Sequence, residues 1–103
     1  MPEFEVYGIP EEVGRCHGCR RVKGLLDDLS INYKFHKVMN KSSEGIEYDR
    51  PLIVSLASRL GQTSLNISYP VIFYDGIRIK NFNELKEKLL SMGSDPIIIE
   101  DYS

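Results

Sequence analysis

Two cysteines, Cys16 and Cys19, are the residues whose spacing most directly indicates chemistry, and they are the only cysteines among the 103 residues. A secreted domain held together by disulfides carries more cysteines, spread along its length. A bridge across two intervening residues closes a small loop, so it constrains little of the unfolded chain and stabilises the fold weakly. The pair therefore indicates redox exchange or metal binding.

The pair is placed where a loop is expected to become a helix. Apolar residues follow it at the spacing of an amphipathic helix, at Val22, Leu25, Leu26 and Leu29. Unpaired N–H groups and the positive dipole end at a helix start favour a thiolate. Basic residues and a histidine surround the pair, namely Arg15, His17, Arg20, Arg21 and Lys23. Cys16 is therefore predicted to be the nucleophile, and Cys19, one turn deeper, the resolving thiol.

Metal binding and inert burial are alternatives to redox exchange. A zinc site could combine the cysteines with His17 and His36, but structural zinc usually takes four ligands in two comparable pairs, and the chain has no second pair. Two copies of the chain could instead share an iron–sulfur cluster or zinc through the same cysteines. An inert buried pair is disfavoured by the position before a helix. We predict no metal ligands, and metal analysis of the purified protein tests this.

Hydrophobic periodicity predicts an α/β fold with the element order β-α-β-α-β-β-α. Strands are expected at residues 3–8, 33–38, 71–74 and 77–80. Helices are expected after the cysteines, at residues 51–60 and at residues 82–92, the last with an inner stripe of Phe82, Leu85, Leu89 and Met92. The apolar run 71–74 is typical of a central strand and the charged segment 33–38 of an edge. These elements predict a four-stranded mixed sheet with helices on both faces.

Three further segments carry specific expectations. Residues 39–49 are polar and are expected to form a mobile surface loop. Pro70 stands directly before a buried strand, where proline is disfavoured, so a cis Tyr69–Pro70 bond is predicted. The tail, residues 94–103, holds three isoleucines between polar ends and is expected to be a short strand or a segment packed on the surface.

Charge and composition limit the cellular role. The net charge of −2 argues against a protein whose main partner is nucleic acid. No apolar run approaches the roughly 20 residues that a membrane helix needs. The acidic start, residues 1–5, differs from the basic and apolar start of a signal peptide. We therefore expect a single domain over residues 1–103 that works in the cytoplasm, away from membranes.

Several segments together resemble the glutaredoxin family of the thioredoxin-fold superfamily. They are residues 4–8, the Arg15-Cys16-His17-Gly18-Cys19 run, the Leu60-Gly61-Gln62-Thr63-Ser64 run, the Ser68-Tyr69-Pro70-Val71-Ile72-Phe73 run, and Asp75-Gly76. The small glutaredoxins, or thioredoxins, of large tailed bacteriophages are the most similar members. The resemblance covers about residues 3–90 and leaves a C-terminal tail, residues 92–103, outside the family core.

The resemblance implies a thioredoxin fold and a dithiol–disulfide oxidoreductase. It implies that Cys16 and Cys19 are catalytic, and that substrate or glutathione binds at Tyr7, Arg15, His17, Tyr69, Pro70 and Asn83. The backbone of Tyr69 would pair with an extended peptide or with glutathione. No bound cofactor is implied, and glutathione is the expected co-substrate. The resemblance also implies a monomer with two kinds of partner. One is a disulfide-containing protein, with ribonucleotide reductase as the phage example, and the other is a reductant, either glutathione or a thioredoxin reductase.

The chain departs from the glutaredoxin pattern at two places. His17-Gly18 stands between the cysteines where the family commonly has Pro-Tyr. Lys80-Asn81 and Asn83 stand where the family commonly has Gly-Gly and Asp, which hold the γ-glutamyl end of glutathione. The departures predict that exchange with proteins is favoured over glutathione chemistry.

Overall fold

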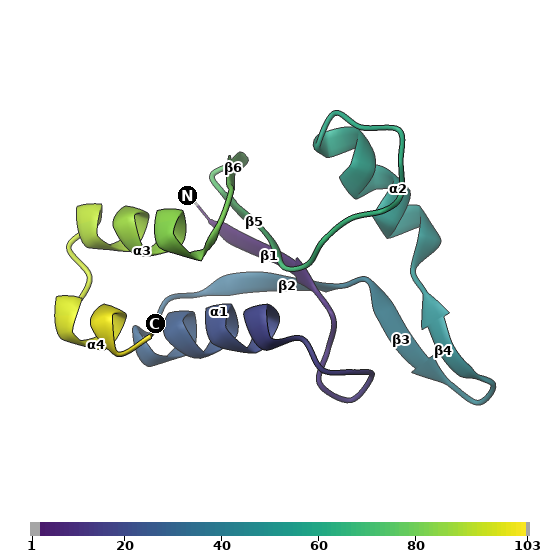
Figure 1. The fold of residues 1–103 in the computed structure, drawn as a ribbon, viewed down its shortest axis with the longest axis horizontal. Helices are drawn as coiled ribbons and strands as arrows, with labels where there is room; N and C mark the ends of the chain where they lie inside the picture. Colours follow the sequence, from purple (N-terminus) through teal and green to yellow (C-terminus); the bar gives the residue numbers. More distant parts are fainter. Residues whose placement is uncertain (1–2, 103) are drawn as a thin grey trace.

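The chain folds around a four-stranded mixed sheet, and the computed structural model describes residues 3–102 (Figure 1). Residues 1, 2 and 103, which the single-domain prediction includes, lie outside the described part. The strands are β1 (Phe4–Gly8), β2 (Tyr33–Lys37), β5 (Val71–Tyr74) and β6 (Ile77–Ile79), in the order β2-β1-β5-β6. β1 runs parallel to β2 and antiparallel to β5, which is antiparallel to β6. The predicted central and edge strands are therefore confirmed.

Helices cover both faces of this sheet. On one face, α1 (His17–Asp28), α3 (Phe82–Ser91) and α4 (Pro96–Asp101) share an apolar core with β1, β5 and β6. On the other face, α2 (Arg50–Arg59) packs its buried side chains, Ile53 and Leu56, against Tyr7, Val71 and Phe73. Alternation along the strands divides the side chains between these two layers. No helix among residues 3–102 is long and apolar enough to cross a membrane.

Side chains at the helix starts explain where the helices begin. The carboxylates of Asp49 and Asp95 accept backbone N–H groups at the starts of α2 and α4. The amide oxygen of Asn81 accepts the N–H of Glu84 at 2.8 Å, so Asn81 caps α3. Each cap satisfies an N–H group that has no partner within its helix. The start of α1 is capped differently, by Cys16.

The segment 39–49 forms a hairpin, so the prediction of a surface loop was wrong. β3 (Met39–Ser42) pairs antiparallel with β4 (Gly45–Tyr48), and Met39 lies opposite Tyr48. Val38, which was predicted to end the preceding strand, is fully buried. Its N–H donates to the Gly8 carbonyl at 3.1 Å, and its carbonyl accepts the N–H of Asp49 at 2.9 Å. Backbone pairing and this anchored base define the hairpin, and neither gives an apolar alternation in the sequence.

The tail forms a helix, where a strand or a surface segment was expected. Three consecutive β-branched residues favour a strand, but Asp95 caps the segment and Pro96 opens it with a backbone angle suited to a helix. Ile99 is fully buried in the core shared with α1 and α3. At the end of α3, Met92 is 45% exposed, so its predicted place on the inner stripe was also wrong.

Candidate active site

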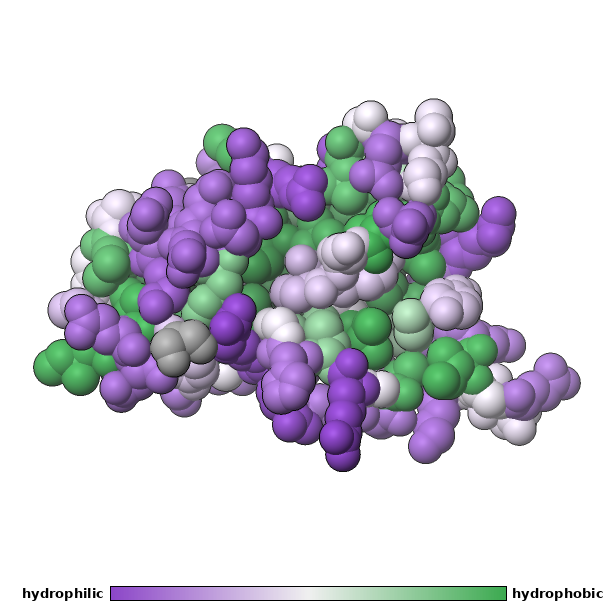
Figure 2. Space-filling view, in the orientation of Figure 1, coloured by the Kyte–Doolittle hydropathy of each residue, from purple (hydrophilic) through white to green (hydrophobic). Residues whose placement is uncertain are grey.

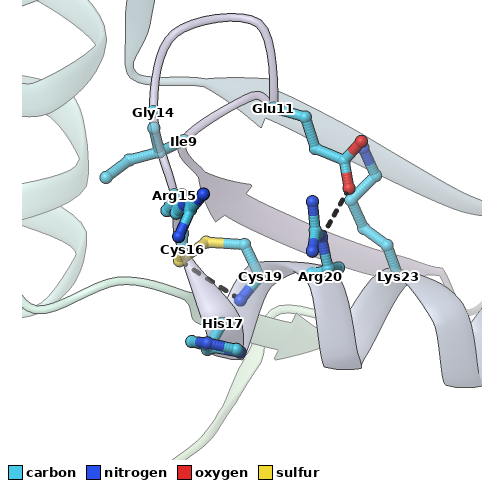
Figure 3. A pocket seen from close by; sticks show the side chains of 9 residues that line it. All are labelled: Ile9, Glu11, Gly14, Arg15, Cys16, His17, Cys19, Arg20 and Lys23. Atoms are coloured by element: carbon cyan, nitrogen blue, oxygen red, sulfur yellow. Dashed lines mark hydrogen bonds and ion pairs between the residues drawn. A yellow bond between two sulfur atoms is a disulfide. The ribbon is translucent and has the colours of Figure 1, made fainter.

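A disulfide joins Cys16 and Cys19 at the start of α1, and their Cα atoms are 5.2 Å apart. Cys16 caps the helix, because its Sγ accepts the backbone N–H of Cys19 at 3.2 Å. Figure 3 shows the two sulfur atoms at the junction of the preceding loop and the helix. Cys16 is partly exposed, whereas Cys19 is only 2% exposed. A partner can therefore approach the sulfur of Cys16 but not that of Cys19.

A groove of about 270 Å³ lies beside the disulfide, between the loop 9–15 and the first turns of α1. Its charged lining is mainly basic, from Arg15, Arg20 and Lys23. Glu11 lies opposite and accepts a hydrogen bond from Nε of Arg20 at 2.9 Å, drawn as a dashed line in Figure 3. Arg15, directly before Cys16, also lines the groove, and the ion pair of Glu11 is made with Arg20 instead. The groove therefore presents positive charge next to the sulfur atoms.

Two glycines permit close packing around the cysteines. A Cβ atom at Gly8 would lie 2.9 Å from Sγ of Cys19, and a Cβ atom at Gly18 would lie 2.7 Å from Cδ of Pro70. Real Cβ atoms do not approach other atoms so closely, so a side chain at either position would displace its neighbour. The bond Tyr69–Pro70 is cis, as predicted. Pro70 thus lies directly against the segment between the two cysteines.

The structure brings some of the predicted substrate-binding residues to the disulfide. Arg15 and His17 line its groove, and Tyr69 and Pro70 lie against Gly18. Asn83 is exposed on the first turn of α3. A smaller cavity of about 100 Å³ separates Gly18 and Pro70 from the start of α3, and its wall is formed by Lys80, Asn81 and Phe82 rather than Asn83.

Tyr7 lies away from the disulfide, in the layer formed by α2. Its side chain is 6% exposed, and its ring stacks on His36 with ring centres 4.4 Å apart. Nη1 of Arg59 donates to its hydroxyl at 3.0 Å. Arg59 also holds Glu5 through two hydrogen bonds, of 2.7 and 3.2 Å, and His36 lies 3.2 Å from the same carboxylate. The hydrogen bond from Arg59 lowers the pKa of Glu5.

These contacts also bear on the zinc alternative. His36 is engaged by Glu5 and Tyr7 on the sheet, and it lines neither cavity beside the cysteines. Among residues 3–102, no three His, Cys, Asp or Glu side chains are grouped so that they could hold a metal ion. The described arrangement of a single chain thus offers two sulfur ligands only, and a shared cluster would need a second copy.

Comparison with known proteins identifies a phage relative. The chain is 58% identical over 99 residues to a protein of Enterobacteria phage T4, described as an uncharacterized 11.8 kDa protein in the Gp55-nrdG intergenic region. The match covers 96% of each chain. This chain belongs to the family of that T4 protein. No protein-family model matches the chain.

A solved structure supports the fold of this chain. The chain matches glutaredoxin 1 from Francisella tularensis, solved with cacodylate, with a TM-score of 0.57 over 89% of this chain and 96% of that one. The sequences are 19% identical, so the likeness concerns the fold. It confirms the predicted thioredoxin fold, with a four-stranded mixed sheet and helices on both faces.

Sequence reasoning missed a second, larger groove on the other side of Ile9. This cavity of about 640 Å³ is bounded by the hairpin β3–β4, the start of α2 and the segment 61–69. Its apolar lining is formed by Ile9, Met39, Tyr48, Ile53, Leu65, Ile67 and Tyr69. Met39 and Tyr48 lie in the segment that was expected to be a loop, and no regular spacing in the sequence could have grouped these residues.

Proposed function

We propose that the chain is a dithiol–disulfide oxidoreductase that reduces protein disulfides through Cys16 and Cys19. The supporting observation is the unequal burial of the pair at a helix start. The sulfur of Cys16 is reachable and accepts a backbone N–H group, so a thiolate formed there is stabilised by that hydrogen bond and by the helix dipole. The sulfur of Cys19 is buried directly behind it, where it can attack a mixed disulfide from within the protein.

The reaction starts from the reduced form of the pair. The thiolate of Cys16 attacks one sulfur of the substrate disulfide, the S–S bond breaks, and the other half leaves as a thiolate that takes up a proton. The thiol of Cys19 then attacks the sulfur of Cys16 and passes its proton to the second departing sulfur. Two electrons have moved to the substrate, and the protein holds the Cys16–Cys19 disulfide described above.

A reductant must return the pair to the dithiol form. The glutaredoxin resemblance favours glutathione as co-substrate or a thioredoxin reductase, in the cytoplasm, with no bound cofactor and with the chain acting as a monomer. Ribonucleotide reductase is the candidate protein substrate that this resemblance offers.

Glutathione is expected to be the poorer substrate. The cavity between Gly18, Pro70 and the start of α3 measures only about 100 Å³, and the side chains of Lys80 and Asn81 form part of its wall. Lys80 offers positive charge, but exposed charge attractions are worth less than about 1 kcal/mol. The combined variant Lys80→Gly, Asn81→Gly and Asn83→Asp should raise turnover of a glutathione mixed disulfide relative to a protein disulfide. No gain, with glutathione already preferred by the natural chain, would contradict this.

Trapping of mixed disulfides tests the proposed roles. Cys19→Ser should accumulate a covalent adduct with a disulfide substrate, because the attacking thiol remains and the resolving thiol is gone. Cys16→Ser should form no adduct and should lose turnover. Iodoacetamide at mildly acidic pH should label Cys16 before Cys19, as peptide mapping would show. Equal trapping by both variants, or turnover by Cys16→Ser, would overturn the proposal, and stoichiometric zinc or iron in the purified protein would favour the metal alternative.

A further inference from the structure

The groove formed by the hairpin β3–β4, α2 and the segment 61–69, called here the hairpin groove, is large and apolar. Tyr48 on one wall is 65% exposed, and the apolar floor includes Leu65 and Ile67. Figure 2 shows hydrophobic residues where Figure 1 places the hairpin β3–β4, with hydrophilic residues around them. An apolar groove of about 640 Å³ is large enough for a large side chain of a partner.

The hairpin groove is continuous with the surroundings of the disulfide. Ile9 lines both the hairpin groove and the groove beside Cys16. At its inner end the hairpin groove is lined by Tyr69, and the next residue, Pro70, lies against Gly18 between the cysteines. Burial raises the pKa of Tyr69, and Tyr48 across the groove adds to this effect. Because Ile9 and the pair Tyr69–Pro70 connect the two grooves, an extended segment whose cysteine reacts with Cys16 would place its neighbouring residues in the hairpin groove.

The charges around the two grooves favour a partner segment of one sign of charge. Arg15, Arg20 and Lys23 border the groove beside Cys16, and Arg50 borders the hairpin groove. Glu11 is the acidic residue in these walls, and Arg20 neutralises it. The whole chain carries a net charge of −2, so this positive border is local. Opposite charge steers association and orients partners, which favours an acidic segment.

We infer that the protein partner presents an extended segment in which acidic residues and one large apolar residue flank the reacting cysteine. The apolar side chain occupies the hairpin groove, and the acidic side chains face Arg15 and Arg50. This inference rests on the proposed function and specifies its substrate class. The partner's disulfide is reduced by the two-electron exchange described above.

The experiment compares disulfide-linked dimers of short peptides that share a central cysteine. One peptide carries a leucine and glutamates, and the others replace the leucine by serine, the glutamates by lysines, or both. The reduced protein should react with the leucine–glutamate peptide about tenfold faster than with the doubly changed peptide, as measured by quenched-flow single-turnover kinetics. A small disulfide without a peptide, hydroxyethyl disulfide, reports the reactivity of the cysteines alone.

Variants of exposed residues assign the preference to the groove. Tyr48→Ser should remove the advantage of leucine, and Arg50→Glu should remove that of glutamate, while hydroxyethyl disulfide reacts as before. Arg50 is in the first turn of α2, where a carboxylate is well tolerated. Ile77→Ser and Arg78→Glu are the matched controls, because both side chains are exposed on β6 and line neither groove. These controls should keep the full preference.

Each outcome has a separate meaning. Equal rates for all peptides, with hydroxyethyl disulfide reduced normally, would overturn the inferred substrate class and leave the oxidoreductase proposal intact. No reaction with any disulfide would overturn the proposed function itself. Sedimentation that shows a dimer, converted to a monomer by Tyr48→Ser, would show that a second copy covers the groove and would also overturn the inference.

Discussion

The two layers that cover the sheet are built differently. The layer of α1, α3 and α4 buries ten described apolar side chains in one cluster with the strands, and the buried Cys19 belongs to the first turn of α1. The layer of α2 buries six, and a polar cluster of Glu5, Arg59, Tyr7 and His36 fastens the end of the helix to the sheet. The hairpin groove lies at the border of this second layer.

The two layers place a fixed disulfide beside a partner surface that is held less rigidly. A dense apolar layer resists local opening, whereas a layer held by polar contacts and bordered by a cavity opens at lower free energy. The disulfide lies where the two layers meet. Gly18, at the start of α1, packs against Pro70, which directly precedes β5. Four predictions test this contrast.

Removal of a buried leucine from each layer should give the largest effects. Leu26 and Leu56 are both fully buried, one in each layer. Leu26→Ala should lower the free energy of unfolding by about 4 kcal/mol and Leu56→Ala by about 2 kcal/mol, because the smaller cluster beside a groove can relax into the space. Urea unfolding of the oxidised protein measures both values. A larger loss for Leu56→Ala would contradict the contrast.

A methyl group added at Gly18, where the two layers meet, should affect the rate of disulfide exchange more than the free energy of unfolding. Gly18→Ala places a Cβ atom where Pro70 now lies, so Pro70 must shift away from the disulfide. We expect the exchange rate with a protein disulfide to fall about tenfold. Gly14→Ala is the matched control, since its Cβ atom would meet Ile9 at an ordinary distance of 3.8 Å. If both variants exchange at the natural rate, Pro70 has no positioning role.

The polar fastening of α2 should make stability depend on acid pH. Arg59 lowers the pKa of Glu5, so the ion pair stabilises the fold at pH values above the usual glutamate pKa, and this contribution is lost as the pH falls through the lowered pKa. Arg59→Met should cost about 1 kcal/mol at pH 7. The gap to the natural chain should close as the pH falls below about 4. Urea titrations at a series of pH values measure it, and a gap that persists in acid would indicate lost packing instead.

A polar contact at the edge of the dense layer should matter least. The hydroxyl of Tyr102 donates to the carboxylate of Asp28, which raises the pKa of Tyr102 to about 12. Tyr102→Phe should cost about 0.5 kcal/mol, since the pair is exposed. The raised pKa means that this contribution is present at neutral pH and is lost as the pH rises from about 10 to about 12. A cost near that of Leu26→Ala would show that the tail is a main support of the layer.

The fold was largely predictable because its main elements carry strong local patterns. The helical spacing from Val22 to Leu29 and the apolar run 71–74 each define an element and its buried side. The hairpin β3–β4 was missed, since its stability comes from backbone pairing and from the anchored Val38. The tail was missed because local capping by Asp95 outweighs the strand preference of three isoleucines.

The candidate site was predictable in its sulfur atoms but not in its walls. The spacing of Cys16 and Cys19 is a local signal, whereas the packing of Gly8 against Cys19 depends on how β1 and α1 meet. Alternation along β1 turns Gly8 toward α1 and Tyr7 toward α2, so Tyr7, whose hydroxyl could bind a substrate, is directed away from the disulfide. No pattern within either segment shows this.

The bare backbone at Gly8 has a consequence for the timing of the proposed reaction. Cys19 sits against it with no free space, so only the outer sulfur can carry a partner. Every covalent complex then forms on Cys16, and its lifetime is set by an attack from inside the protein rather than by a collision with a second molecule. The rate of release would then not depend on the concentration of other thiols in solution. Gly8→Ala, by moving the Sγ atom of Cys19, should lengthen the time for which a captured partner is held.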